Sequence, residues 1–317
     1  MRTICTALLL ALSLAMQAGQ GAAAQADTGQ ADTGQEDTGQ EAAGFYDGTV
    51  SVRLLEQGEV LALPLHDYLI DVVLQEMPAS FETEALKAQA VAARTFTMQR
   101  IYGGGSHEDA DVCGDPTCCQ CYLDEAEGRD LYGEGYAAAR DKVRAAVEET
   151  DGQVLVYGGE LIEAAYFSST GGSTEAAAAV WGGDVPYLQP VSSPETPRVR
   201  VVTVSITDFR AALPEAALDG EPAAWFGETE RTAGGAVAAM TIGGVRYTGG
   251  TLRSRFSLPS ARFTAAVTAD GICFEVTGSG HGVGLSQYGA DEMARAGADY
   301  RDILLHYYTG AELKELY

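Results

Sequence analysis

One short segment of the chain concentrates residue types that bind metals. Five potential ligands fall within 15 residues, in a stretch without a strong helix or strand pattern: His107, Cys113, Cys118, Cys119 and Cys121. Thiolates and imidazole at such spacing are typical of tetrahedral zinc. We expect the first four to form a closed, structural zinc site with no position for water, and Cys121 to be a substitute ligand.

Two other readings of these cysteines remain open at this point. One or two disulfides, for instance Cys121 with Cys273, would suit an exported protein. Adjacent cysteines such as Cys118 and Cys119 pair only with strained geometry. A cysteine peptidase with Cys119 and His281 as its catalytic pair would need a free thiolate of low pKa.

A single carboxylate stands out between two expected helices. Glu76 precedes Met77-Pro78 and follows an apolar run over residues 69–74. Partial burial beside such a run would raise its pKa and suit it to general acid catalysis, although most glutamates are simply solvated. Arg94 lies among alanines in the next expected helix, where a cation needs either a carboxylate partner or an exposed face.

Residues 280–289 form a glycine-rich segment that contains His281 and Ser286. Glycines let a backbone approach a ligand closely. The spacing differs by one residue from the nucleophile elbow of serine hydrolases, so Ser286 is more simply a helix N-cap. His281 is either a packed loop residue or a substrate contact.

The elements that position these residues mix helices and strands without a repeating βαβ order, which favours the α+β class. Hairpins are expected over residues 49–63 and around Gly158-Gly159. Helices are expected over 68–75, 82–102, 136–149, 286–296 and 300–308, the last capped by Asp299. Residues 106–135 are expected to be a loop. Residues 199–276 are expected to be strand-rich, with one helix near 208–213.

The N-terminus predicts export. Residues 1–24 combine a cationic start, an apolar run and small residues, which is the layout of a signal peptide or signal anchor. Residues 25–44, with three five-residue repeats, are expected to be a disordered linker. The folded unit then covers 45–317. We expect the protein in the cell envelope or on the outer face of the membrane, with the signal either cleaved or retained.

The charge excludes one class of partner. Lys and Arg number 20 against 45 Asp and Glu, a net charge of −25, which repels nucleic-acid phosphates. No nucleic-acid binding is expected.

Four blocks of sequence, in the same order, resemble the SpoIID/LytB family over roughly residues 48–310. They are residues 63–95 around Glu76-Met77-Pro78, the loop from His107 to Gln120, residues 164–181, and residues 280–290. The resemblance implies one SpoIID-like catalytic unit. It also implies a sporulation or cell-wall peptidoglycan lytic transglycosylase, which cleaves the bond between N-acetylmuramic acid and N-acetylglucosamine in denuded glycan strands and leaves a 1,6-anhydro end.

The resemblance also implies roles for individual residues. Glu76 matches the catalytic glutamate, and Arg94 and His281 match further family positions. His107, Cys113 and Cys119 match a zinc pattern in which Cys118 stands where the family usually has histidine. The substrate-binding candidates lie in the matched blocks or beside them: Tyr166, Ser168, Trp181, Tyr187, Ser286 and Gln287.

The implied partners are peptidoglycan glycan strands, a cell-wall amidase of the SpoIIP type and a membrane partner of the SpoIIM type. The alternative function is a non-enzymatic, peptidoglycan-binding amidase enhancer of the LytB type.

Overall fold

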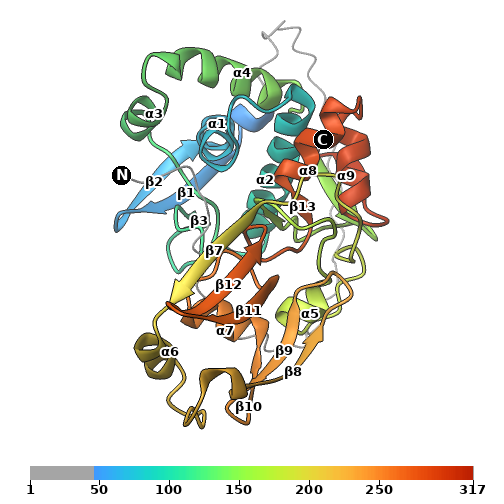
Figure 1. The fold of residues 1–317 in the computed structure, drawn as a ribbon. Helices are drawn as coiled ribbons and strands as arrows, with labels where there is room; N and C mark the ends of the chain where they lie inside the picture. The colour runs from blue at the N-terminus through green and yellow to red at the C-terminus, as the bar shows by residue number, and fades with distance from the viewer. Residues whose placement is uncertain (1–45, 317) are drawn as a thin grey trace, which may run out of the picture.

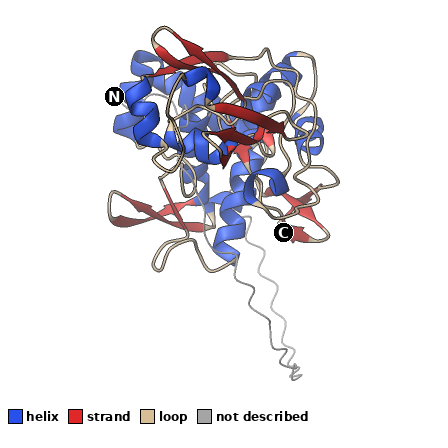
Figure 2. Ribbon diagram, turned by 60° about the horizontal axis from the view of Figure 1, so that its bottom comes forward, coloured by secondary structure: helices blue, strands red, loops and turns tan. Residues whose placement is uncertain are grey.

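The computed structural model describes residues 46–316. The expected signal sequence and repeat linker lie outside these residues. Helices and strands are mixed, and the strands form several small sheets rather than one large one (Figure 2). The α+β prediction is therefore confirmed. Among the described residues, no helix is both long and apolar enough to cross a bilayer.

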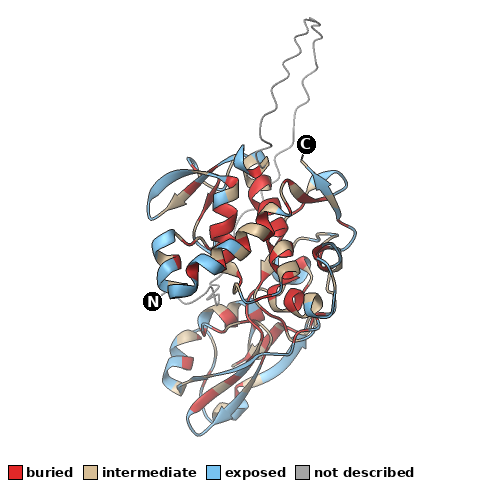
Figure 3. Ribbon diagram, turned by 90° about the horizontal axis from the view of Figure 1, so that it is seen from above, coloured by how far each residue is buried: buried red, intermediate tan, exposed pale blue. Residues whose placement is uncertain are grey.

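The first part of the chain surrounds helix α2 (Figure 1). Its elements are η1 (Tyr46–Gly48), β1 (Ser51–Glu56), β2 (Glu59–Pro64), α1 (Leu65–Glu76), α2 (Thr83–Tyr102), β3 (Val112–Cys113), α3 (Glu125–Tyr132), η2 (Gly133–Gly135), α4 (Tyr136–Glu148), β4 (Gln153–Tyr157), β5 (Glu160–Leu161), β6 (Tyr166–Phe167) and α5 (Ala177–Trp181). Alanines along α2 let α1, α4 and two helices from the end of the chain, α8 (Gln287–Arg295) and α9 (Tyr300–Tyr307), approach it closely, so most of α2 is buried (Figure 3).

The middle of the chain builds a second unit with its own hydrophobic core, centred on Phe209, Phe256 and Phe274. Its elements are β7 (Val199–Val204), α6 (Ile206–Ala212), η3 (Pro222–Ala224), β8 (Phe226–Arg231), β9 (Val237–Ile242), β10 (Val245–Thr248), α7 (Gly249–Arg255), β11 (Phe263–Thr268) and β12 (Gly271–Thr277). Two antiparallel sheets, with orders β10-β9-β8 and β11-β12-β7, carry this core.

The last part of the chain then packs against the hydrophobic core around α1 and α2, here called the first core. The returning elements are β13 (Leu285–Ser286), α8 (Gln287–Arg295), α9 (Tyr300–Tyr307) and β14 (Glu312–Glu315). Strand β13 pairs in parallel with β6, and β14 adds an edge to β4. Segments more than 100 residues apart therefore lie side by side, which brings residues near 166 and 286 to one place.

Most expected elements are present, and three expectations are wrong. Residues 106–135 contain α3, which begins with a capping box between Asp124 and Glu127. The strand-rich region holds a second helix, α7, capped by Thr248. The strand expected after Gly159 is short, and β6 pairs with β13 instead of continuing the hairpin.

Candidate active site

Glu76 is the last residue of α1 and sits partly buried where three segments of the chain meet. The apolar helix before it is buried on nearly every side, which holds the carboxyl group in place. Its Oε1 accepts a hydrogen bond from the Cys121 backbone N–H at 2.9 Å, and its Oε2 accepts one from Gln287 Nε2 at 3.3 Å. The carboxyl thus has fixed neutral donors and a partly open side.

Burial raises the pKa of Glu76 from 4.5 to about 7, although hydrogen bonds from Cys121, Gln287 and Tyr166 act in the opposite direction. No Lys, Arg or His side chain within residues 46–316 forms an ion pair with it. Desolvation therefore dominates. Near neutral pH, both the protonated and the ionised form of the carboxyl are therefore populated. A group that first donates a proton and then accepts one needs both forms.

A network of buried hydrogen bonds lies beside the Glu76 carboxyl. The Tyr166 hydroxyl donates to Gln120 Oε1 at 2.8 Å and also lies within hydrogen-bonding reach of Glu76. Gln120 is almost fully buried, and its Nε2 donates to Thr97 Oγ1 at 2.9 Å and to the Tyr68 hydroxyl at 3.3 Å. Gln120 and Tyr68 are site residues that the sequence analysis missed.

The predicted metal ligands come together. The ligand atoms of His107, Cys113, Cys118 and Cys119 all lie within 4.8 Å of one another. Sγ of Cys118 is 3.7 Å from His107 Nε2 and 3.8 Å from Cys119 Sγ. Tetrahedral zinc with Zn–S bonds of about 2.3 Å requires sulfur separations of about 3.8 Å. The donor set and its spacing fit zinc, which these four residues would hold without an open position.

The pKa of the Cys119 thiol is lowered to about 5, chiefly by a hydrogen bond from Cys113 and further by one from His107. A thiolate is the form that binds metal. Cys121, expected as a substitute ligand, is not in this group; its backbone N–H donates to Glu76 instead. The metal loop and the carboxyl are therefore joined through residues 119–121.

His281 does not reach Glu76 through a hydrogen bond, and its own ring is fully engaged. Nδ1 accepts from the Val283 N–H at 3.1 Å, and the ring also bonds to the Tyr166 backbone. Burial, and then the nearby Arg253 cation, lower its pKa to about 4. The imidazole is therefore neutral at neutral pH, and it packs against Phe167 and Trp181. Its catalytic role stays a prediction.

The structure does not bring Arg94 to the carboxyl. Its guanidinium is fully buried and pairs with Asp47 at 2.7 Å, and it also donates to the Val147 and Gln153 carbonyls. Arg94 joins α2 to the start of the described chain and to β4. These contacts give Arg94 a structural place away from the carboxyl, and its catalytic role stays a prediction.

We expect Arg94→Met to lower the free energy of unfolding by about 3–5 kcal/mol, because Asp47 would remain buried without its partner. Arg129→Met, which breaks an exposed pair with Glu125, should cost less than about 1 kcal/mol. Urea denaturation measures both. Unchanged stability together with lost activity in Arg94→Met would instead support a catalytic role for Arg94.

The other substrate-binding candidates separate into two groups. Tyr166 and Gln287 border Glu76, and Trp181 is 46% exposed beside His281. Ser286 is fully buried: it caps α8 and donates to Glu195 Oε1 at 2.7 Å. These contacts give Ser286 a structural place, and its substrate role stays a prediction.

Two candidates lie apart from the carboxyl. Tyr187 packs against Tyr157, and its hydroxyl accepts from the Glu163 N–H. Ser168 is partly buried, and its carbonyl accepts from the Tyr288 N–H. Among residues 46–316, the bonds of these two residues lead to Glu163 and Tyr288 rather than to Glu76, so their substrate roles stay predictions.

The pairing of Cys121 with Cys273 is not formed, because Cys273 is a free cysteine on β12 in the second unit. Cys121 is nevertheless in a disulfide, so the disulfide alternative holds for this one cysteine. Cys119 groups with His107, whereas His281 lies against Phe167 and Trp181. The geometry thus gives no support to a Cys119–His281 peptidase.

Comparison of the sequence with known proteins identifies the family. The family model described as SpoIID, stage II sporulation protein, matches residues 56–157. Stage II sporulation protein D of Bacillus subtilis (strain 168) is 38% identical over 260 residues, covering 80% of this chain and 75% of that protein. The Bacillus amyloliquefaciens protein of the same name is 36% identical over 274 residues, 84% and 79% of the two chains.

A more distant relative is the amidase enhancer of Bacillus subtilis (strain 168), 29% identical over 301 residues, which are 76% of this chain and 39% of that protein. More than a third of the residues are identical to two stage II sporulation D proteins over most of both chains. The chain belongs to the SpoIID family.

Proposed function

We propose that the chain is a peptidoglycan lytic transglycosylase in which Glu76 is both the general acid and the general base. The observation that carries this proposal is one partly buried carboxyl with a pKa of about 7 and only neutral hydrogen-bond partners. A group of that pKa serves both halves of the reaction near neutral pH.

In the first half, Glu76 gives its proton to the oxygen that links N-acetylmuramic acid to N-acetylglucosamine, and the bond from muramic C1 to that oxygen breaks. In the second half, the C6 hydroxyl of the same muramic acid forms a bond to C1 and returns its proton to Glu76. No water is consumed, and the product is a 1,6-anhydro end.

Glu175 is a second carboxyl, in the block of residues 164–181 that resembles the family. Its contacts support this reaction over hydrolysis, because hydrolysis usually needs two carboxyls at a defined separation. Glu175 accepts from the Ala236 N–H and pairs with Arg262. It lines a cavity that Glu76 does not line.

We expect the rate of glycan cleavage, as kcat/KM, to fall as the pH rises through about 7, because the acid form of Glu76 is then lost. A profile from about pH 5 to about pH 9 measures this. Asp71 also has a pKa raised by burial to about 7, so Asp71→Asn is the control and should keep the same profile. A rate that rises through pH 7 would contradict the proposed acid.

The function itself is tested with denuded glycan strands and the purified chain, with products read by mass spectrometry. Anhydro ends support the proposal, and reducing ends from hydrolysis contradict it. No cleavage, combined with faster glycan release by an added amidase, would favour the amidase-enhancer alternative that the more distant relative suggests. Export, and assembly with a SpoIIP-type amidase and a SpoIIM-type membrane protein, are part of the proposal. Zinc would serve as a structural ion that holds the loop carrying Gln120 and Cys121.

A further inference from the structure

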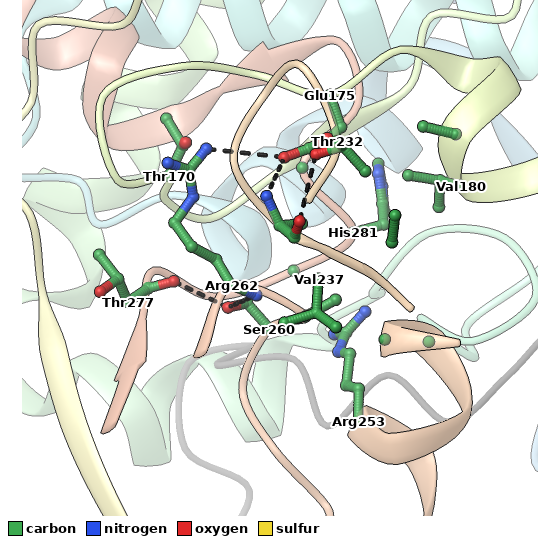
Figure 4. A pocket seen from close by; sticks show the side chains of 18 of the residues that line it. Thr170, Glu175, Val180, Thr232, Val237, Arg253, Ser260, Arg262, Thr277 and His281 are labelled. Atoms are coloured by element: carbon green, nitrogen blue, oxygen red, sulfur yellow. Dashed lines mark hydrogen bonds and ion pairs between the residues drawn. The ribbon is translucent and has the colours of Figure 1, made fainter. Parts of the chain in front are cut away.

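A cavity of about 190 Å³ lies between the first core and the second unit, apart from the Glu76 carboxyl (Figure 4). Its walls include Glu175, Val180 and His281 from the first part and Arg253 and Arg262 from the second. Two buried polar atoms in these walls have no hydrogen-bond partner within residues 46–316: Nη2 of Arg253 and Oε2 of Glu175.

Arg253 is the more unusual of the two. It is only 8% exposed, and its Nε donates to the Leu258 carbonyl. No carboxylate in residues 46–316 pairs with it, and burial alone lowers its pKa to about 10. The guanidinium is therefore still charged at neutral pH. A buried cation without a counter-charge is strongly unfavourable, which indicates that an anion from outside the chain completes the site.

Glu175 restricts what that anion can be. Its Oε1 accepts from the Ala236 N–H at 3.0 Å and lies 3.6 Å from Arg262, and its Oε2 is left as an acceptor. A carboxylate in the same cavity disfavours a dianion such as phosphate. The walls therefore suit a ligand with one negative charge and an O–H or N–H group.

The edge of the cavity suits a sugar. Trp181 is exposed beside His281, with ring centroids 5.1 Å apart, and an exposed indole is a stacking surface for a pyranose ring. The His281 ring bonds to the backbone of Tyr166, whose hydroxyl reaches Glu76. A single tyrosine thus separates this cavity from the carboxyl that performs the proposed chemistry.

We propose that Arg253 binds the free lactyl carboxylate of a muramic acid residue and so selects glycan from which the stem peptide has been removed. The inference rests on the proposed function for the identity of the sugar. A stem peptide converts the lactyl carboxylate into a neutral amide, which cannot neutralise a buried guanidinium. A charge-assisted pair with arginine is directional and can be bidentate, so the neutral form loses most of the interaction.

The test measures binding in Glu76→Gln, which removes turnover, by NMR titration with four probes. These are N-acetylmuramic acid, its methyl ester, N-acetylglucosamine and inorganic phosphate. We expect the free acid to bind at least about tenfold more tightly than the ester or N-acetylglucosamine. Equal binding of the ester would overturn the inference, and so would phosphate binding as tightly as the free acid. N-acetylmuramoyl-L-alanine, with its carboxylate one residue further out, should bind weakly; tight binding would assign the site to a peptide carboxylate instead.

Two variants on one helix assign the effect to Arg253. Arg253→Met should remove the preference for the free acid and unfold at the same or a higher temperature, because no ion pair is lost. Arg255→Met makes the same charge change two residues away, where Arg255 pairs with Glu215 at 2.6 Å, and should keep the preference. A preference that survives Arg253→Met would overturn the assignment. These experiments measure binding and not cleavage. Lack of a preference for the free acid in Glu76→Gln would therefore count against the Arg253 inference alone, and lack of anhydro product would count against the proposed function alone.

Discussion

Replacing Glu76 with Gln is expected to lower the formation of anhydro ends from denuded glycan by at least about a thousandfold, because one group supplies both proton transfers. The change is small in structure. Gln keeps an oxygen that can accept from the Cys121 N–H, which now donates to Glu76 at 2.9 Å. Mass spectrometry of the products over time measures the loss.

The same variant should fold, and it should be more stable than the wild type at high pH. The native carboxyl resists ionisation, with a pKa of about 7 against 4.5. Its folded state therefore loses stability as the pH rises from about 4.5 to about 7, by at most about 3 kcal/mol. Gln lacks this cost. Glu82→Gln, an exposed carboxyl near Arg295, is the control for both activity and stability. Anhydro product at the wild-type rate from Glu76→Gln would refute the assignment of the acid.

Removing the metal is expected to reduce activity about 10- to 100-fold, the usual range when groups that orient a site are lost, although no predicted ligand contacts Glu76. The last predicted metal ligand is Cys119. The next two residues place the Gln120 side chain and the Cys121 N–H next to Tyr166 and Glu76. Without metal, no bonds to a common ion hold the four ligands together, and the loop should loosen. Cys119→Ser and a chelator should give the same loss.

Hydrogen exchange gives a second measure of this effect: the Cys121 amide should exchange faster without metal. Cys273→Ser changes a free cysteine outside the cluster and should leave both activity and exchange unchanged. Full activity in a sample shown by metal analysis to be free of zinc would contradict this link between the loop and the carboxyl.

Elements with local causes could be predicted from the sequence. The alanine-rich α2, the hairpin turned by Gly158-Gly159 and the Asp299 cap of α9 are each determined by residues within a few positions. Helix α7 was missed because it begins with two glycines, which are poor helix formers. The Asp124 capping box could have revealed α3.

The site was predictable only where a motif or cluster carried it. Glu76 and the four metal ligands are marked by short-range patterns. Gln120 is not, because its role depends on Tyr68 and Tyr166, which are distant in sequence. The ion pair of Arg94 could not be predicted for the same reason: its partner Asp47 lies 47 residues earlier, and no local pattern links the two.

The second unit leaves and rejoins the first core at a single point. Val199 pairs with Thr277 across β7 and β12, and Ser169 bridges Ser279 just beyond. Glu76, the metal ligands, Tyr166 and Gln287 all lie outside residues 199–277, whereas Arg253 lies within them. A chain with a tight turn in place of residues 199–277 would keep Glu76 and its hydrogen-bond partners and would lose Arg253. The proposed catalysis and the proposed selectivity thus depend on separate stretches of the chain, so a change in one stretch can leave the other intact.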